Sequence, residues 1–259
     1  MKDGETVKKT IFIILLLSIG LALAQGSHPK YYQPRRIVNM PNAGLLPDRC
    51  WMGQVRLGEG GTLVTYVGLG LWGRLQAGAS YGAHGVLGRG KATAYPRPHV
   101  QVKVRPVCES LKWPAIVIGY DDQGIGSWSD SIKRYAIKSP GAFLVASKNW
   151  TTIGGNLGLH AGFNYSFETE DQPGFNVYFG LDKNLGGMFA VSIEYDSGIN
   201  DNNTKDGIYG TGKGYLNASV KWSVRPNFEV EFIMADILIN DENAETFARE
   251  VRLTFVYPL

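Results

Sequence analysis

The chain has 259 residues, of which 44% are hydrophobic, 19% charged and 12% aromatic, and its formal net charge is +3. A charge this close to balance gives no reason to expect a nucleic-acid partner, which requires a clustered basic face. The 2 cysteines exclude a disulfide scaffold and a zinc site built from cysteines.

The N-terminus has the features of a secretory signal peptide. Lys8 and Lys9 precede an apolar run over residues 11–24, which ends in the small-residue motif Ala22-Leu23-Ala24. The run has 14 residues, fewer than the roughly 20 that a membrane-spanning helix needs. We therefore expect residues 1–24 to be a cleaved signal peptide, with an uncleaved anchor as the alternative.

The next segment, residues 25–49, is rich in Pro, Tyr and Arg and has no hydrophobic period. It predicts an irregular lead segment that lies either in the periplasm or inside the lumen of a barrel. From Cys50 onward the sequence changes to short stretches in which apolar residues alternate with small or polar ones.

This alternation predicts an all-β chain. In Asn156–Phe167, for example, Leu159 and Phe163 would lie on one face, with His160 and Asn164 on the other. Segments of about ten residues with this period, separated by turn residues, are typical of outer-membrane barrels. We expect residues 50–259 to form a single antiparallel transmembrane β-barrel of about twelve strands. The strands are expected near 50–58, 61–71, 73–82, 98–106, 113–121, 140–148, 156–167, 174–182, 187–196, 213–222, 227–236 and 247–258.

The connections between these strands alternate in length. Short links near residues 71–73, 148–155 and 223–227 alternate with longer, Gly- and Asn-rich ones at 83–97, 122–139 and 197–212. Short periplasmic turns and longer external loops are the pattern of outer-membrane barrels, and a secreted β-sandwich would not need this regularity.

Aromatic residues cluster near the expected strand ends, where they would form girdles at the membrane interfaces. The alternative is that they cap a soluble core. The residues are Trp51, Trp72, Trp113, Trp150, Trp222, Tyr81, Tyr120, Tyr195 and Tyr257.

The sequence predicts no catalytic, cofactor or metal site. The four histidines lack metal-ligand spacing, and His160, even with Ser166 on the same face, has no third partner at a readable spacing. Gly68-Leu-Gly-Leu-Trp-Gly73 matches a dinucleotide fingerprint, but a strand follows it instead of a helix. Cys50 and Cys108 are expected to lie too far apart to form a disulfide. We expect no enzyme activity.

Charged residues at inward positions predict two walls of the lumen, because burying them against lipid would cost about 2–4 kcal/mol for each Arg or Lys. Such walls could pair and plug a narrow lumen, or they could guide a polar solute by a transverse field. The basic wall is expected to consist of Arg56, Arg74, Lys103 and Arg105. The acidic wall is expected to consist of Asp182, Glu194, Glu229 and Glu231.

Three segments carry a resemblance to a known family. Val100–Gly126 runs from a Lys-x-Arg strand end through Glu-Ser and Pro-Ala to an apolar strand and a glycine loop, Phe143–Asn149 contains Val-Ala-Ser-Lys, and Ile37–Pro47 precedes the first strand. These segments resemble the YjbH-type outer-membrane β-barrel proteins. The resemblance implies a barrel in the outer membrane of a Gram-negative cell, associated with exopolysaccharide or capsule export.

Three functions follow from these patterns. The first, implied by the resemblance, is an accessory protein or conduit in exopolysaccharide secretion. The second is a small-solute channel of the porin type, and the third is a structural barrel whose long loops interact outside the cell. The expected partners are outer-membrane lipid, a polysaccharide or small polar solute, and the barrel assembly machinery, with no nucleic acid. Sugar-binding aromatics would be Tyr178, Trp128, Tyr135 and Tyr209.

Overall fold

The structure is a computed structural model that describes residues 34–88, 91–168, 172, 174–202 and 210–259. The expected signal peptide, residues 1–24, lies outside the described residues, as do residues 25–33 of the lead segment and Tyr209.

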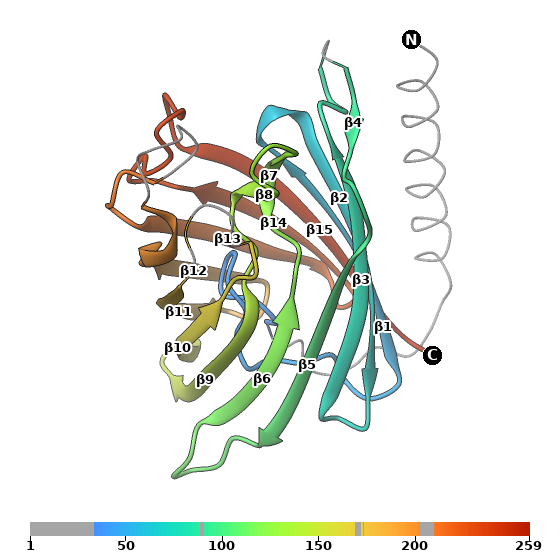
Figure 1. Cartoon of the computed structure of the whole chain (residues 1–259). Helices are drawn as coiled ribbons and strands as arrows, with labels where there is room; N and C mark the ends of the chain where they lie inside the picture. The colour runs from blue at the N-terminus through green and yellow to red at the C-terminus, as the bar shows by residue number, and fades with distance from the viewer. Residues whose placement is uncertain (1–33, 89–90, 169–171, 173, 203–209) are drawn as a thin grey trace.

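Twelve strands of the described part form one closed antiparallel barrel (Figure 1). Each strand pairs with the next along the chain, and the last pairs with the first, with Trp51 opposite Tyr257. The barrel strands are β1 (Cys50–Gly58), β2 (Thr62–Leu71), β3 (Leu75–His84), β5 (His99–Val107), β6 (Ala115–Asp121), β9 (Gly141–Thr152), β10 (Gly155–Tyr165), β11 (Phe175–Leu185), β12 (Phe189–Asp196), β13 (Tyr215–Arg225), β14 (Phe228–Ala235) and β15 (Ala248–Pro258). The predicted fold class is confirmed, and the bounds of each strand lie within about four residues of the prediction.

The two-residue period sets the two faces of this sheet. On β10, Leu159 and Phe163 are exposed on the outside, whereas His160 and Asn164 are buried inside. On β11, Phe175, Val177, Phe179 and Leu181 are exposed in the same way. An outward apolar band around an inward polar face is the arrangement expected of a barrel in lipid.

The two ends of the barrel differ. At one end, here called the turn end, the connections are short, as at 72–74, 153–154, 186–188 and 226–227. At the other, the loop end, most connections are longer and carry the strand β4 (Thr93–Ala94), the hairpin β7 (Ile125–Ser129) and β8 (Arg134–Ile137), and the 3-10 turn η2 (Ile199–Asp201). The exception is the three-residue 3-10 turn η1 (Glu59–Gly61), which joins β1 to β2. Among the described residues, no helix is long and apolar enough to cross a membrane.

The aromatic residues divide between the two ends. Trp72 and Trp113 lie in turns at the turn end and are exposed, and Trp51, Trp150, Trp222 and Tyr257 lie near the strand ends there. Tyr120 and Tyr195 lie at strand ends on the loop end. Amphipathic rings at these two levels match the interface girdles of outer-membrane barrels.

Candidate functional site

The lumen contains the lead segment. Before β1 begins, the chain lies inside the ring of strands, as the blue trace in Figure 1 shows, and folds back on itself through an antiparallel bridge between Arg36 and Pro41. Ile37 and Val38 are fully buried. Ile37, Met40 and Ala43 pack against Val117 of β6 and, in the same cluster, against Ala115, Phe143, Val145 and Tyr178. Residues 34–49 therefore form a resident segment of the lumen, here called the lumen segment.

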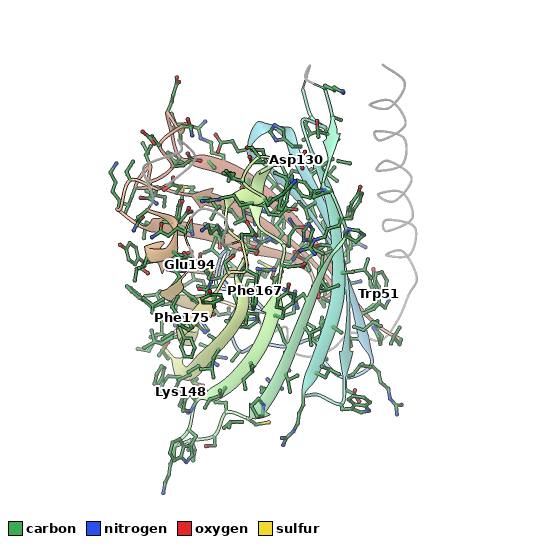
Figure 2. All side chains as sticks on the ribbon, in the orientation of Figure 1. Trp51, Asp130, Lys148, Phe167, Phe175 and Glu194 are labelled. Atoms are coloured by element: carbon green, nitrogen blue, oxygen red, sulfur yellow. The ribbon has the colours of Figure 1, made fainter. Side chains whose placement is uncertain are left out.

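One carboxylate holds the start of the lumen segment. The N–H groups of Val38, Asn39 and Met40 all donate to Oε2 of Glu194, at 2.9, 2.9 and 2.8 Å. The other oxygen of Glu194 accepts from Asn217 Nδ2 at 2.8 Å. An irregular backbone has no ladder partners, so its buried N–H groups need side-chain acceptors. A carboxylate facing consecutive N–H groups forms charge-assisted bonds and keeps its charge balanced by their dipoles. In Figure 2, Glu194 lies between Asp130, near the loop end, and Lys148, near the turn end.

Cations from three strands bind the carbonyl groups of the same segment. Lys103 Nζ donates to the carbonyls of Arg35 at 2.8 Å and Gly44 at 2.9 Å. Lys221 Nζ donates to Ile37 O at 3.2 Å, and Arg252 Nη1 donates to Val38 O at 3.0 Å. Four carbonyl groups of the segment are thus bound by lumen side chains, of which Lys103 is fully buried.

Two further anchors hold the second half of the segment. Gln76 Oε1 accepts from the N–H of Leu46 at 3.0 Å, and Ser147 Oγ accepts from the N–H of Ala43 at 2.9 Å. Ser147 also contacts Nδ1 of His160 at 2.8 Å, and Nε2 of His160 contacts Asp182 Oδ1 at 2.6 Å.

Ser147, His160 and Asp182 are hydrogen-bonded to one another in the order of a hydrolytic triad. Their other contacts, however, support the lumen segment. Ser147 is buried, and the N–H of Ala43 already occupies its oxygen. If Nε2–H of His160 donates to Asp182, then Nδ1 accepts a hydrogen bond from the Ser147 hydroxyl. The oxygen of that hydroxyl accepts from the N–H of Ala43, so the chain of hydrogen bonds ends on the lumen segment. Ser166, the partner considered from the sequence, accepts instead from Glu168 N–H at 3.3 Å. His160 therefore acts as a positioning residue for Ser147.

The expected basic wall is only partly in the lumen. Lys103 lies there as described, and Arg56 pairs with Glu250 and donates to Asn39 Oδ1 at 3.0 Å. Arg105, near the turn end of β5, donates to Gly73 O at 2.8 Å. The assignment of Arg74 to the wall is wrong, because β3 begins at Leu75 and Arg74 is exposed in the preceding turn.

The expected acidic residues are all buried on the inner side, but they do not face a basic wall across water. Glu231 pairs with Arg252 at 2.8 Å and with Lys221 at 3.7 Å, both on neighbouring strands. Asp182 pairs with His160, and Glu194 binds the lumen segment. Glu229 lies beside them. The transverse field considered from the sequence is therefore replaced by local pairs, because the lumen segment separates the two sides.

Two cavities flank the lumen segment. The larger, about 1340 Å³ with the solvent space at its mouth, lies toward the loop end, and the smaller, about 430 Å³, lies toward the turn end. Both are lined by Arg36, Gln54, Tyr66 and Arg252, so they adjoin at these residues. Arg36 comes from the lumen segment itself and pairs with Asp121 of β6.

The two cavities differ in the charged side chains that line them. Six carboxylates and four cations line the larger cavity, whereas two carboxylates and four cations line the smaller one. At the mouth of the larger cavity, burial raises the pKa of Glu59, and the nearby carboxylates of Asp241, Glu250 and Asp236 raise it further. Acidic side chains therefore predominate in the lining toward the loop end, and basic ones in the lining toward the turn end.

Sequence reasoning missed most of the residues that hold the segment, including Gln76, Ser147, Lys221 and Arg252. The available indication was an apolar stretch on both faces of two strands, Ala115–Ile118 and Phe143–Ala146. Inward apolar residues in a barrel with a polar interior require a covering group.

No family model and no curated protein matches the chain. Among solved structures, a KdgM porin is similar with a TM-score of 0.50 at 11% identity, over 81% of this chain and 99% of that chain. A KdgM porin in complex with disordered oligogalacturonate has a TM-score of 0.48 at 10% identity, over 81% and 99% of the two chains. A NanC porin has a TM-score of 0.40 at 11% identity, over 81% and 98%. The likeness to the first of these, at 11% identity, shows a shared barrel fold alone.

Proposed function

We propose that this chain is an outer-membrane protein whose barrel passes small polar solutes through a lumen narrowed by residues 34–49. A closed barrel leaves no unpaired strand edge in lipid. Its apolar outer band and two aromatic levels support a position in the outer membrane.

The observation that carries this proposal is the meeting of the two cavities at Arg36, Gln54, Tyr66 and Arg252. Ile37, Met40 and Ala43 of the lumen segment pack on the β6, β9 and β11 side. On the β1, β2 and β15 side, Leu46 packs on an apolar cluster, and polar groups of these strands line the cavities. Most cations there face a carboxylate, as in the pairs Arg56–Glu250 and Arg252–Glu231. Such a narrow path with balanced charge suits a small polar solute better than a long, highly charged one.

Single-channel recording in planar bilayers tests the proposal. The protein purified from outer membranes should conduct weakly, and Arg36→Ala should raise its conductance severalfold and shift selectivity toward cations, because a guanidinium leaves the junction. Arg74→Ala is the matched control, since that side chain lies in an exposed turn outside the lumen. Absence of conductance in all three proteins, with barrels that still migrate differently before and after boiling, would exclude the channel.

A second candidate is an accessory role in exopolysaccharide secretion, which rests on the resemblance to the YjbH-type proteins. The three segments that carry the resemblance meet in one unit: Ile37, Met40 and Ala43 pack on Val117 and Val145, and Lys103 binds the carbonyl of Gly44. Because these three segments contact one another, a chain that keeps one of them has a structural reason to keep the other two. Deleting the gene should then lower surface polysaccharide; unchanged polysaccharide with altered uptake of small solutes would favour the channel.

A further inference from the structure

Besides the two lumen cavities, a further hollow lies at the loop end, outside the lumen. Its volume is about 820 Å³ with the solvent space at its mouth. Its lining comes from the loop before β5 and the start of β5, the end of β6, the β7–β8 hairpin, the start of β9 and the residues after β10. It lies on a different set of residues from the two lumen cavities. We call it the loop groove.

Aromatic rings form one part of its lining. Trp128 comes from β7, Tyr120 from the end of β6, and Phe167 follows β10. Tyr120 and Phe167 lie against each other with centroids 6.0 Å apart, and Trp128 packs edge-on against Tyr135 at 5.0 Å. Because each ring is supported by another ring, these rings offer apolar surface in a set orientation.

Polar groups form the other part, and they too are held in place. Asp122 accepts from the N–H of Val100 at 2.7 Å and pairs with Arg97 at 3.2 Å. His99 lies 3.5 Å from the same carboxylate, and its other nitrogen contacts Tyr135 Oη at 2.6 Å. Burial alone would raise the pKa of Asp122, but the hydrogen bonds from His99 and Val100 and the charge of Arg97 lower it. Asp122 is therefore a carboxylate at neutral pH.

The charges in the groove are mixed. Arg97 and Lys133 each lie near a carboxylate, Asp122 and Asp130 respectively, and Glu168 adds a third acid. Glu168 accepts from the N–H groups of Tyr135 and Ser139, at 2.8 and 3.0 Å. A groove with three carboxylates and two paired cations does not attract an anion. Rings combined with a few fixed donors and acceptors are the composition of a small-ligand site.

We propose that the loop groove binds a neutral oligosaccharide. A pyranose ring has an apolar C–H face that stacks on an aromatic ring, and a rim of hydroxyls that both donate and accept. Trp128 would take a C–H face, with the Tyr120–Phe167 pair bounding the groove at the level of the loop-end girdle, while Asp122, Asp130 and Arg97 would take the hydroxyls. The loop groove shares no lining residue with the two lumen cavities, so sugar binding there can be tested independently of the proposed channel.

Binding of labelled cellohexaose, maltohexaose, laminarihexaose and chitohexaose tests the proposal by fluorescence polarisation. The full chain is used in a detergent without a sugar headgroup, since a glycoside detergent would compete. At least one of the four should bind, and Trp128→Ala should weaken it about threefold to tenfold, as expected for one aromatic contact. Trp113→Ala is the matched control, because Trp113 is exposed at the turn end.

Arg97→Ala provides a second variant, since its side chain is 64% exposed and its loss does not threaten folding. It should weaken binding while the channel conductance stays unchanged. Two results would overturn the proposal: no binding of any of the four sugars up to millimolar concentration, or an equal loss in Trp128→Ala and Trp113→Ala.

Discussion

The two sides of the lumen differ in what they present to its centre. On β6 and β9 the inward residues include Ala115, Val117, Phe143 and Val145, which are buried and apolar. On β1, β2 and β15 they include Gln54, Tyr66 and Arg252, which line the cavities. A barrel interior is polar where it meets water, so the apolar side marks the place where a segment docks.

The docked segment joins both kinds of surface. Ile37, Met40 and Ala43 pack on β6, β9 and β11, whereas Val38 packs on β14 and Leu46 on β1, β2 and β15. Its peptide groups face charged side chains of β5, β12, β13 and β15. Hydrophobic contact alone would not determine which way the backbone turns, whereas hydrogen bonds to fixed groups do. The comparison predicts that polar anchors and apolar contacts contribute separately to docking.

The largest effect is expected from Glu194→Ala. It removes the acceptor of three buried N–H groups and leaves them unsatisfied, at an expected cost of about 1–3 kcal/mol to docking for each. Residues 34–49 should become sensitive to protease and the conductance should rise. Glu245→Ala is the control, because Glu245 is exposed at the loop end. Protease resistance equal to that of the wild type would contradict the anchor role.

A smaller effect is expected from Ile37→Ala on the apolar side. Ile37 is fully buried against β6, β9 and β11, and truncating a buried isoleucine costs about 2–5 kcal/mol, the lower part of the range where the surroundings relax. Proteolysis of the segment at increasing urea measures the loss. The backbone hydrogen bonds to Glu194 should persist, so the double variant with Glu194→Ala should lose more than either alone; no further loss would argue against two separate contributions.

The smallest effect is expected from His160→Gln. His160 acts on the lumen segment only through Ser147, whose bond to Ala43 N–H stays possible without the imidazole. We expect a loss of about 1 kcal/mol, that of one neutral hydrogen bond. Ser147→Ala, which removes the acceptor itself, should cost more. A larger loss for His160→Gln than for Ser147→Ala would show that His160 has a role beyond positioning.

Several features followed from short stretches of sequence. The alternation in Asn156–Phe167 was enough to place Leu159 outside and His160 inside, because side chains on a strand alternate strictly between two faces. The unequal lengths of the connections and the position of the tryptophans at strand ends could likewise be predicted from residues that are close together in the sequence. Arg74 shows the limit, since an error of two residues at the start of β3 moved it from the lumen to a turn.

The sequence by itself determined the barrel, its two unlike ends and its outward apolar band, because each depends on neighbouring residues and a period of two. Only the tertiary structure decided what fills the lumen. Residues 34–49 have no period, and their partners are Gln76, Lys103, Ser147, Glu194, Lys221 and Arg252. These come from six strands, the most distant being Arg252, 214 residues along the chain from Val38, and only closure of the barrel brings them around one backbone.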